Sequence, residues 1–207
     1  MLQKRVIPCL LLYKGGLYKT EKFKNPVYIG DPINAIKIFN EKEVDELIFL
    51  DIGASVENKE PNYRMIEDIA SECFMPLCYG GGVKTIEQMK NIYAIGVEKI
   101  SISSQAVINP SLLIEASNMF GNQSVVVTID IKKDFWGEKK VFINSGKKNT
   151  KLNPMDFIKQ IETLGAGEIV INSVDNDGVM RGYDVKLLRD IKAITKIPII
   201  ALGGAGG

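Results

Sequence analysis

The sequence contains no histidine at all. A Ser-His-Asp triad and a Cys-His pair are therefore excluded as the catalytic machinery of this chain. The absence also argues against a catalytic zinc site, since histidine supplies ligands in most of them, and we expect neither a metal ion nor a cofactor. Any proton transfer must be carried by Asp, Glu, Lys, Tyr or Cys side chains.

Cysteine, net charge and long apolar runs are also scarce. The three cysteines (Cys9, Cys73 and Cys78) are odd in number, which favours reduced core thiols over disulfides or nucleophiles. A formal net charge of +1 gives no general attraction to nucleic acid or to membranes. No apolar run approaches the roughly 20 residues of a membrane-spanning helix, and the first residues lack the form of a signal peptide. We therefore expect a cytoplasmic protein.

The chain does contain an internal repeat. Segments 75–82 and 197–204 share a proline, a short apolar run and a glycine pair, and Pro198 lies 122 residues after Pro76 (198 − 76). The pairs Gly81-Gly82 and Gly203-Gly204 keep this spacing, as do segments 46–50 and 168–172. Glycine after a parallel strand lets a phosphate approach backbone N–H groups. The repeat therefore predicts two similar halves with one phosphate site each.

Apolar runs of strand length alternate with helical patterns along the chain. The expected strands are, in order, 6–12, 46–52, 76–79, 99–102, 124–130, 168–174 and 197–202. Strict alternation predicts a parallel sheet covered by helices. Seven strands in halves of four and three predict a (βα)8 TIM barrel whose eighth βα unit is missing, as one domain over residues 1–207 that is incomplete at its C-terminus. A doubly wound open sheet is the alternative, but the half-repeat favours the barrel.

Smaller features complete this outline. Asp31-Pro32 and Asn109-Pro110 are typical helix starts, with a capping side chain before a proline. Residues 14–26 are expected to form a long basic loop carrying Lys19, either a solvated excursion or a mobile cover that brings a lysine onto an anionic ligand. Residues 141–143 are expected in a small hairpin.

The active site of a barrel lies at the C-terminal ends of its strands. The polar and small residues expected there are Asp51, Gly81, Gly82, Ser103, Ser104, Asp130, Asn172, Asp175, Asp177, Gly178, Gly203 and Gly204. Asp130 is the best acid/base candidate, because its apolar neighbours would raise the pKa of its carboxyl group. The alternative is an Asp that pairs with Lys132 or Lys133 or caps a loop. The matching position in the first half is Leu11, so the opposed carboxylate that an acid/base pair would need is missing.

At this point the sequence resembles the family of cyclase subunits of imidazole glycerol phosphate synthase over its whole length. The resemblance rests on segments 4–10, 30–32, 45–52, 80–82, 121–127, 145–150, 165–169 and 203–206. It implies a (βα)8 barrel that takes ammonia from a partner glutaminase. The substrate implied is a bisphosphorylated ribulosyl-formimino aminoimidazole carboxamide. The products implied are imidazole glycerol phosphate and aminoimidazole carboxamide ribotide.

The resemblance also assigns roles to individual residues. One phosphate would bind near Gly81, Gly82, Ser103 and Ser104, and the other near Asp177, Gly178, Gly203 and Gly204. Lys19 matches the family's loop lysine and Asp130 one of its two catalytic aspartates, whereas Leu11 stands at the other. Arg5, Glu46, Lys99 and Glu168 match a ring of charges that gates ammonia, with Glu98 near the glutaminase. The alternative for this ring is a plain salt-bridge plug.

A branch of this family resembles the chain closely in segments 10–12, 19–20, 23–26 and 30–35. Its members act in acetamidino modification of surface polysaccharides and nonulosonic sugars, with a glutaminase and an amidotransferase-like, sugar-modifying partner. The leading hypothesis is a member of that branch, because Leu11 breaks the acid/base pair while the charged ring is retained. The alternatives are a true cyclase of histidine biosynthesis and a scaffold that conducts ammonia and activates the glutaminase.

Overall fold

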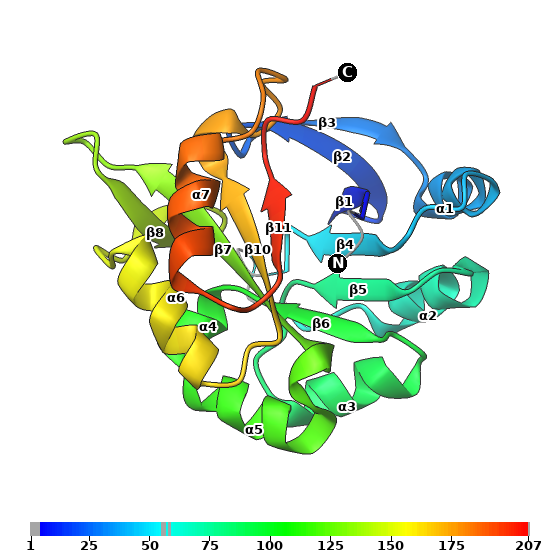
Figure 1. The fold of residues 1–207 in the computed structure, drawn as a ribbon. Helices are drawn as coiled ribbons and strands as arrows, with labels where there is room; N and C mark the ends of the chain where they lie inside the picture. The colour runs from blue at the N-terminus through cyan, green and yellow to red at the C-terminus, as the bar shows by residue number, and fades with distance from the viewer. Residues whose placement is uncertain (1–4, 55–56, 58, 207) are drawn as a thin grey trace. The chain divides into compact units, whose positions relative to one another are not determined.

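The computed structural model describes residues 5–54, 57 and 59–206 (Figure 1). It divides into two compact units, each described by itself. The first unit comprises the chain up to Lys19 together with Val27–Ser101, and the second comprises Thr20–Pro26 together with the chain from Ile102 onward.

The first unit is a parallel sheet with helices in its connections. Strands β1 (Cys9–Tyr13), β4 (Leu47–Asp51), β5 (Leu77–Gly80) and β6 (Lys99–Ile102) pair in parallel in the order β6-β5-β4-β1. The helices are α1 (Pro32–Glu41), α2 (Tyr63–Glu72) and α3 (Ile86–Ala94), and α1 packs against α2 and α2 against α3 (Figure 1). This arrangement places the C-terminal ends of the four strands at one edge.

Side-chain caps determine where these helices begin. The Asp31 carboxylate accepts hydrogen bonds from the N–H groups of Ile33 and Asn34, as the Asp31-Pro32 pattern predicts. Thr85 and Gln88 form a reciprocal capping box at the start of α3. The apolar faces of the helices are buried against the strands with residues such as Phe49, Ile66 and Met89.

The second unit repeats the plan with three parallel strands. Strand β10 (Glu168–Ser173) pairs with β7 (Val125–Lys133) on one side and with β11 (Ile199–Leu202) on the other. Strands β8 (Lys139–Ile143) and β9 (Lys148–Asn149) add an antiparallel extension to β7, which contains the hairpin predicted at 141–143. The helices are α4 (Ser104–Ile108), α5 (Ser111–Phe120), α6 (Pro154–Thr163) and α7 (Val185–Ile194), with short 3₁₀ turns η1 (Asn122–Ser124) and η2 (Val174–Asn176).

These two units confirm the predicted fold class, a parallel α/β fold of the (βα)-barrel type. Within the described residues the parallel strands number four in the first unit and three in the second, as the half-repeat predicts. The helices of the described part of the chain include none long and apolar enough to cross a membrane.

Residues 14–26 are not a loop, and that prediction is wrong. They contain most of a β-hairpin made of β2 (Gly16–Glu21), which pairs antiparallel with β1, and β3 (Lys24–Gly30). Leu17 is buried, and the ring of Tyr18 packs edge-on against those of Tyr13 and Tyr28. This aromatic packing stabilises β2 and β3, although the lysine-rich composition of the segment is typical of a loop.

Two element boundaries also differ from the predictions. Asn109 is not the N-cap of a helix: α5 begins after Pro110 without a side-chain cap, and Asn109 is instead the C-cap of the additional helix α4. The first strand begins at Cys9 instead of residue 6, because the N–H of Val6 is bonded to the Asp45 carboxylate outside the sheet.

Candidate functional site

Asp130 is the central titratable group of the second unit. It lies near the C-terminal end of β7, is 7% exposed, and stands opposite Asn172 of β10. The Asn172 Nδ2 group donates a hydrogen bond of 3.1 Å to Asp130 Oδ1. Burial raises the pKa of Asp130 to about 7, with a smaller contribution from the negative charge of Asp177, while the Asn172 hydrogen bond opposes the rise. Asp130 is therefore suited to exchange protons at neutral pH.

The surroundings of Asp130 differ from the predicted alternative, in which a lysine would pair with it. Lys132 Nζ lies 5.3 Å from the centre of the Phe142 ring. The backbone N–H of Lys133 donates to Asp175. Asn172 Oδ1 is buried and has no hydrogen-bond partner among the described residues. A buried acceptor in this state is unusual and marks a place for a donor from a ligand or water.

Asp177 fastens the hairpin tip, residues 20–26, to the loop after β10. Its Oδ2 atom accepts hydrogen bonds from Thr20 Oγ1 at 2.7 Å and from the Phe23 N–H at 3.1 Å, and its backbone carbonyl accepts one from Lys22. Lys22 and Phe23 both have positive φ angles, 53° and 61°. Such strain persists only where the surroundings enforce it, so Asp177 supports the tip whether or not it also binds a phosphate.

The second glycine pair lies in tight backbone contact with its neighbours. Gly203 and Gly204 have φ angles of 89° and 104°, and a Cβ atom on them would lie 2.5 Å from the Ser173 carbonyl oxygen and 2.2 Å from that of Gly182. The Cβ of Asn176 is also next to Gly204. The structure therefore brings the loops after β10 and β11 together, as the predicted phosphate site of Asp177, Gly178, Gly203 and Gly204 requires. Phosphate binding there stays a prediction.

The first glycine pair has the same character in the first unit. A Cβ on Gly81, whose φ is 120°, would lie 2.4 Å from the Asp51 carbonyl oxygen. Gly82 follows with a φ of 71°. Ser103 and Ser104, expected at the same phosphate, belong to the second unit, where Ser104 Oγ accepts the N–H of Asn144. Their binding role stays a prediction as well.

Asp51 ends β4 and folds back onto its own loop. Its Oδ1 atom accepts the N–H groups of Gly53 and Ala54. Burial raises the pKa of Asp51 in spite of these two bonds. Leu11, on β1, is opposite Leu50 and Tyr18, so the first unit has an apolar side chain at the position that corresponds to Asp130.

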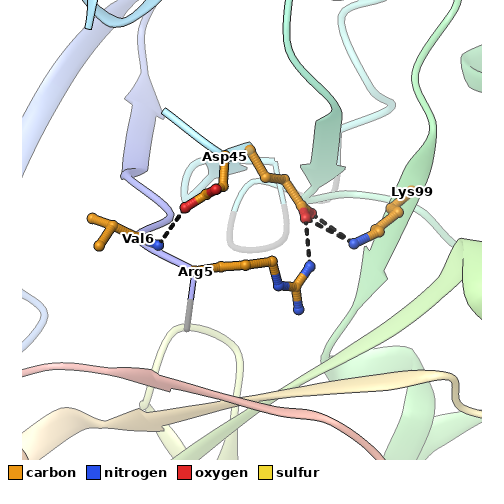
Figure 2. A network of polar contacts seen from close by, with 5 residues as sticks. Arg5, Val6, Asp45 and Lys99 are labelled. Atoms are coloured by element: carbon orange, nitrogen blue, oxygen red, sulfur yellow. Dashed lines mark hydrogen bonds and ion pairs between the residues drawn. The ribbon is translucent and has the colours of Figure 1, made fainter. Parts of the chain in front are cut away.

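Three of the four predicted gate charges meet in the first unit, at the N-terminal ends of the strands. The carboxylate of Glu46 accepts bonds of 3.0 Å from Arg5 and 2.8 Å from Lys99. Figure 2 shows the side chains of Arg5 and Lys99 converging on one carboxylate. The Glu46 side chain is only 3% exposed, whereas those of Arg5 and Lys99 are 36% and 19% exposed. We call Arg5, Glu46 and Lys99 the charge cluster.

The remaining predicted residues are placed as follows. Glu168 begins β10 and is buried in the second unit. Glu98 precedes β6, and its N–H donates to the Leu77 carbonyl. Lys19 is exposed on β2, not on a loop. No group of three or more Cys, Asp or Glu side chains in the described part of the chain is arranged to hold a metal ion.

Sequence reasoning missed two groups of contacts. The first group is the set of bonds from the hairpin tip to Asp177, which a prediction of a loop at residues 14–26 does not include. Lys139 of β8 forms an ion pair with Asp184, the N-cap of α7. The only sequence signal for that pair was the cap position of Asp184.

Comparison with known proteins agrees with this architecture. Residues 5–207 match the family described as Histidine biosynthesis protein. The chain belongs to this family. It is 53% identical over 206 residues to "Putative imidazole glycerol phosphate synthase subunit hisF2" of Pseudomonas aeruginosa, covering 100% of this chain and 82% of that protein. It is 42% identical, with the same coverage, to "Imidazole glycerol phosphate synthase subunit HisF" of Natranaerobius thermophilus. The predicted resemblance to a HisF-like cyclase subunit is thereby confirmed.

Proposed function

We propose that this HisF-like chain receives ammonia from a partner glutaminase and serves the acetamidino modification of a surface-polysaccharide or nonulosonic sugar in the cytoplasm. The observation that carries the proposal is the side chain on β1 at the position that corresponds to Asp130. Leu11 cannot exchange a proton, whereas Asp130 of the second unit, with a pKa near 7, can. The acid/base pair of the family is therefore reduced to one member.

The charge cluster supports the ammonia part of the proposal. Burying the Glu46 carboxylate, which is 3% exposed, costs desolvation free energy even though two cations bind it. Apolar residues of similar size often stabilise a protein as well or better, so a purely structural plug would not need these charges. The position of the charge cluster at the N-terminal ends of the strands supports a role as a gate for ammonia. Glu168 would complete the ring, and Glu98 would contact the glutaminase.

The phosphate sites fit the same function. Both glycine pairs retain positive φ angles and close backbone contacts. With both glycine pairs in place, the barrel binds a phosphorylated small molecule through their backbone N–H groups. Lys19 adds a positive charge for the same ligand. We place the phosphates at Gly81, Gly82, Ser103 and Ser104, and at Asp177, Gly178, Gly203 and Gly204.

The pattern of relatives supports a separate branch. Four relatives whose names begin with "Putative" are 52% or 53% identical to this chain. Four relatives named HisF without that word are 39% to 42% identical. The chain is thus nearer to the former group.

A second candidate function is the cyclase of histidine biosynthesis. The environment of Asp130 favours it, since a buried carboxyl with a pKa near 7 could act as acid and base in turn. In that case a single aspartate would carry the reaction that the family assigns to two.

Deleting the gene separates the two functions. We expect loss of the acetamidino group from the surface sugar, measured by mass spectrometry, and growth without added histidine. Unchanged sugar together with histidine auxotrophy would reject the proposal in favour of the second candidate.

A further inference from the structure

Asp130 and Asn172 form a side-by-side pair on two strands of the second unit. The parallel register places Asn172 of β10 next to Asp130 of β7, so both side chains lie on the same face of the sheet. Asn172 is 4% exposed and Asp130 is 7% exposed. The Asn172 Nδ2 group donates to Asp130 Oδ1 at 3.1 Å. The two side chains therefore share one buried hydrogen bond.

The first unit has two leucines at the corresponding places. Leu50 precedes Asn172 by 122 residues (172 − 50), the spacing of the repeat, and Leu11 is the counterpart of Asp130. The parallel register again places the two side by side, Leu11 on β1 and Leu50 on β4. The same place in the fold thus accommodates an apolar pair. Packing alone does not require Asp130 and Asn172, and the two differ from their counterparts together.

The orientation of the Asn172 amide follows from the charge of Asp130. A carboxylate only accepts hydrogen bonds, so the amide must turn its N–H group toward Asp130. The reverse orientation would place two acceptors against each other. Asn172 Oδ1 is consequently left buried without a partner among the described residues, which costs stability. Asn172 therefore binds the carboxylate at the expense of its own acceptor.

The two oxygens of Asp130 are not equivalent. Oδ1 accepts the Asn172 N–H group, whereas no described residue donates to Oδ2. Building on the proton-exchanging role that the proposed function gives Asp130, we propose that Asn172 is its positioning residue. The amide binds Oδ1, fixes the plane of the carboxyl group and leaves Oδ2 as the atom that exchanges protons with the ligand.

The charged groups of the elements around β7 do not take this role. They are Lys132 and Lys133 on β7, Lys139 and Lys140 on β8, Glu115 on α5, Glu168 on β10, Asp175 in η2 and Asp177 after it. Lys132 lies over the Phe142 ring, Lys139 pairs with Asp184 and Lys140 with Glu138. Burial and, to a smaller extent, Asp177 raise the pKa of Asp130, while the Asn172 bond lowers it. The amide is thus the neighbour that favours the charged carboxyl group.

The titration of Asp130 tests the inference without any turnover. The full chain is labelled with carbon-13 at its aspartate carboxyl groups, and the signal that disappears in Asp130→Asn is followed by NMR as the pH is changed. In Asn172→Leu, which copies the residue of the first unit, the pKa of Asp130 should rise by about one to two pH units, because a hydrogen bond to a charged group is lost.

Ser173→Ala is the matched control. Ser173 is the next residue on β10 and is also buried, but its side chain lies on the other face of the sheet. This substitution should leave the pKa of Asp130 unchanged. An unchanged pKa in a folded Asn172→Leu protein as well would overturn the inference.

The same exchange can be made in reverse in the first unit, which keeps the inference testable if Asn172→Leu does not fold. Leu11→Asp is prepared with and without Leu50→Asn, and the added amide should lower the pKa of the introduced carboxyl group by a similar amount. In that case, a pKa that is the same with and without Leu50→Asn would overturn the inference.

Failure of the proposed function has a different signature. The pKa values would then shift as predicted, while deletion of the gene left the surface sugar unchanged. If the proposed function holds, the pH dependence of acetamidino-sugar formation should move in Asn172→Leu in the same direction as the pKa of Asp130.

Discussion

The two units share one plan but differ at the C-terminal end of their first strand. In the second unit β7 carries Asp130, buried beside Asn172, with a pKa raised to about 7 by burial. In the first unit β1 carries Leu11, next to Leu50. Both units nevertheless have a glycine pair in which an added Cβ would lie close to backbone oxygens of neighbouring loops. The comparison shows that both units have a glycine pair with positive φ angles, whereas the buried carboxylate of Asp130 in the second unit has an apolar counterpart, Leu11, in the first.

Replacing Asp130 should produce the largest effect on activity. Asp130→Asn keeps the shape of the side chain but removes its proton exchange. The ammonia-dependent formation of the acetamidino sugar should therefore fall by about 10² to 10⁴-fold. Asp156→Asn, at the exposed start of α6, is the control and should leave the rate unchanged. Full activity of Asp130→Asn would mean that neither unit contributes a catalytic acid, and the ammonia-conducting scaffold would become the better account.

In the first unit, stability should be most sensitive to substitution in the charge cluster. Glu46→Gln removes a buried carboxylate that bonds both Lys99 and Arg5, which should lower the free energy of unfolding by about 3–5 kcal/mol. Glu87→Gln removes a surface ion pair with Lys90 and should change stability by less than about 1 kcal/mol. Urea unfolding measures both. Equal effects of the two substitutions would contradict a buried cluster.

The pKa of Asp130 predicts how stability depends on pH. Because this carboxyl has a higher pKa in the folded protein than the ordinary 3.8, the folded state binds more protons between pH 3.8 and about 7. Its contribution to stability is therefore greatest at low pH and declines as the pH rises through that window, by about 4 kcal/mol at 1.36 kcal/mol per pH unit. The difference in unfolding free energy between the unmodified protein and Asp130→Asn should follow this slope. A difference that stays constant from pH 4 to pH 8 would mean that Asp130 is not desolvated.

The two glycine pairs should respond alike to an added methyl group. Gly81→Ala and Gly203→Ala each place a Cβ within 2.5 Å of a backbone oxygen at a positive φ, which should cost about 1–3 kcal/mol beyond the conformational penalty. Gly96→Ala, at a φ of 109° with no atom within 4 Å of the added Cβ, isolates that penalty at about 1 kcal/mol. Thermal unfolding compares the three variants. A loss of stability in only one of the two variants would show that the two glycine pairs are not structurally equivalent.

The sequence predicted those features that depend on repeated local patterns. The repeated pattern of a proline, an apolar run and two glycines predicts the parallel strands and the glycine pairs that follow them. The N-cap at Asp31 followed from Asp and Pro in sequence. Asp130 was recognisable because a carboxylate ended a long apolar run.

Features that depend on distant packing could not be predicted in this way. The strands β2 and β3 are stabilised by Tyr13, Tyr18 and Tyr28, which are separated in the sequence, while the local composition is that of a basic loop. The bonds from Thr20 and Phe23 to Asp177 join residues more than 150 positions apart. The amide of Asn172 beside Asp130 likewise required the pairing of β7 with β10 to be known.

The most direct test of the central claim is ammonia-dependent turnover of the ribulosyl-formimino substrate by the full-length protein, measured beside Leu11→Asp. The account predicts no turnover by the unmodified protein and a measurable gain in Leu11→Asp, since the substitution places a proton-exchanging group on β1 at the position that corresponds to Asp130. Robust turnover by the unmodified protein would contradict it, because Asp130 alone would then suffice for the chemistry of histidine biosynthesis.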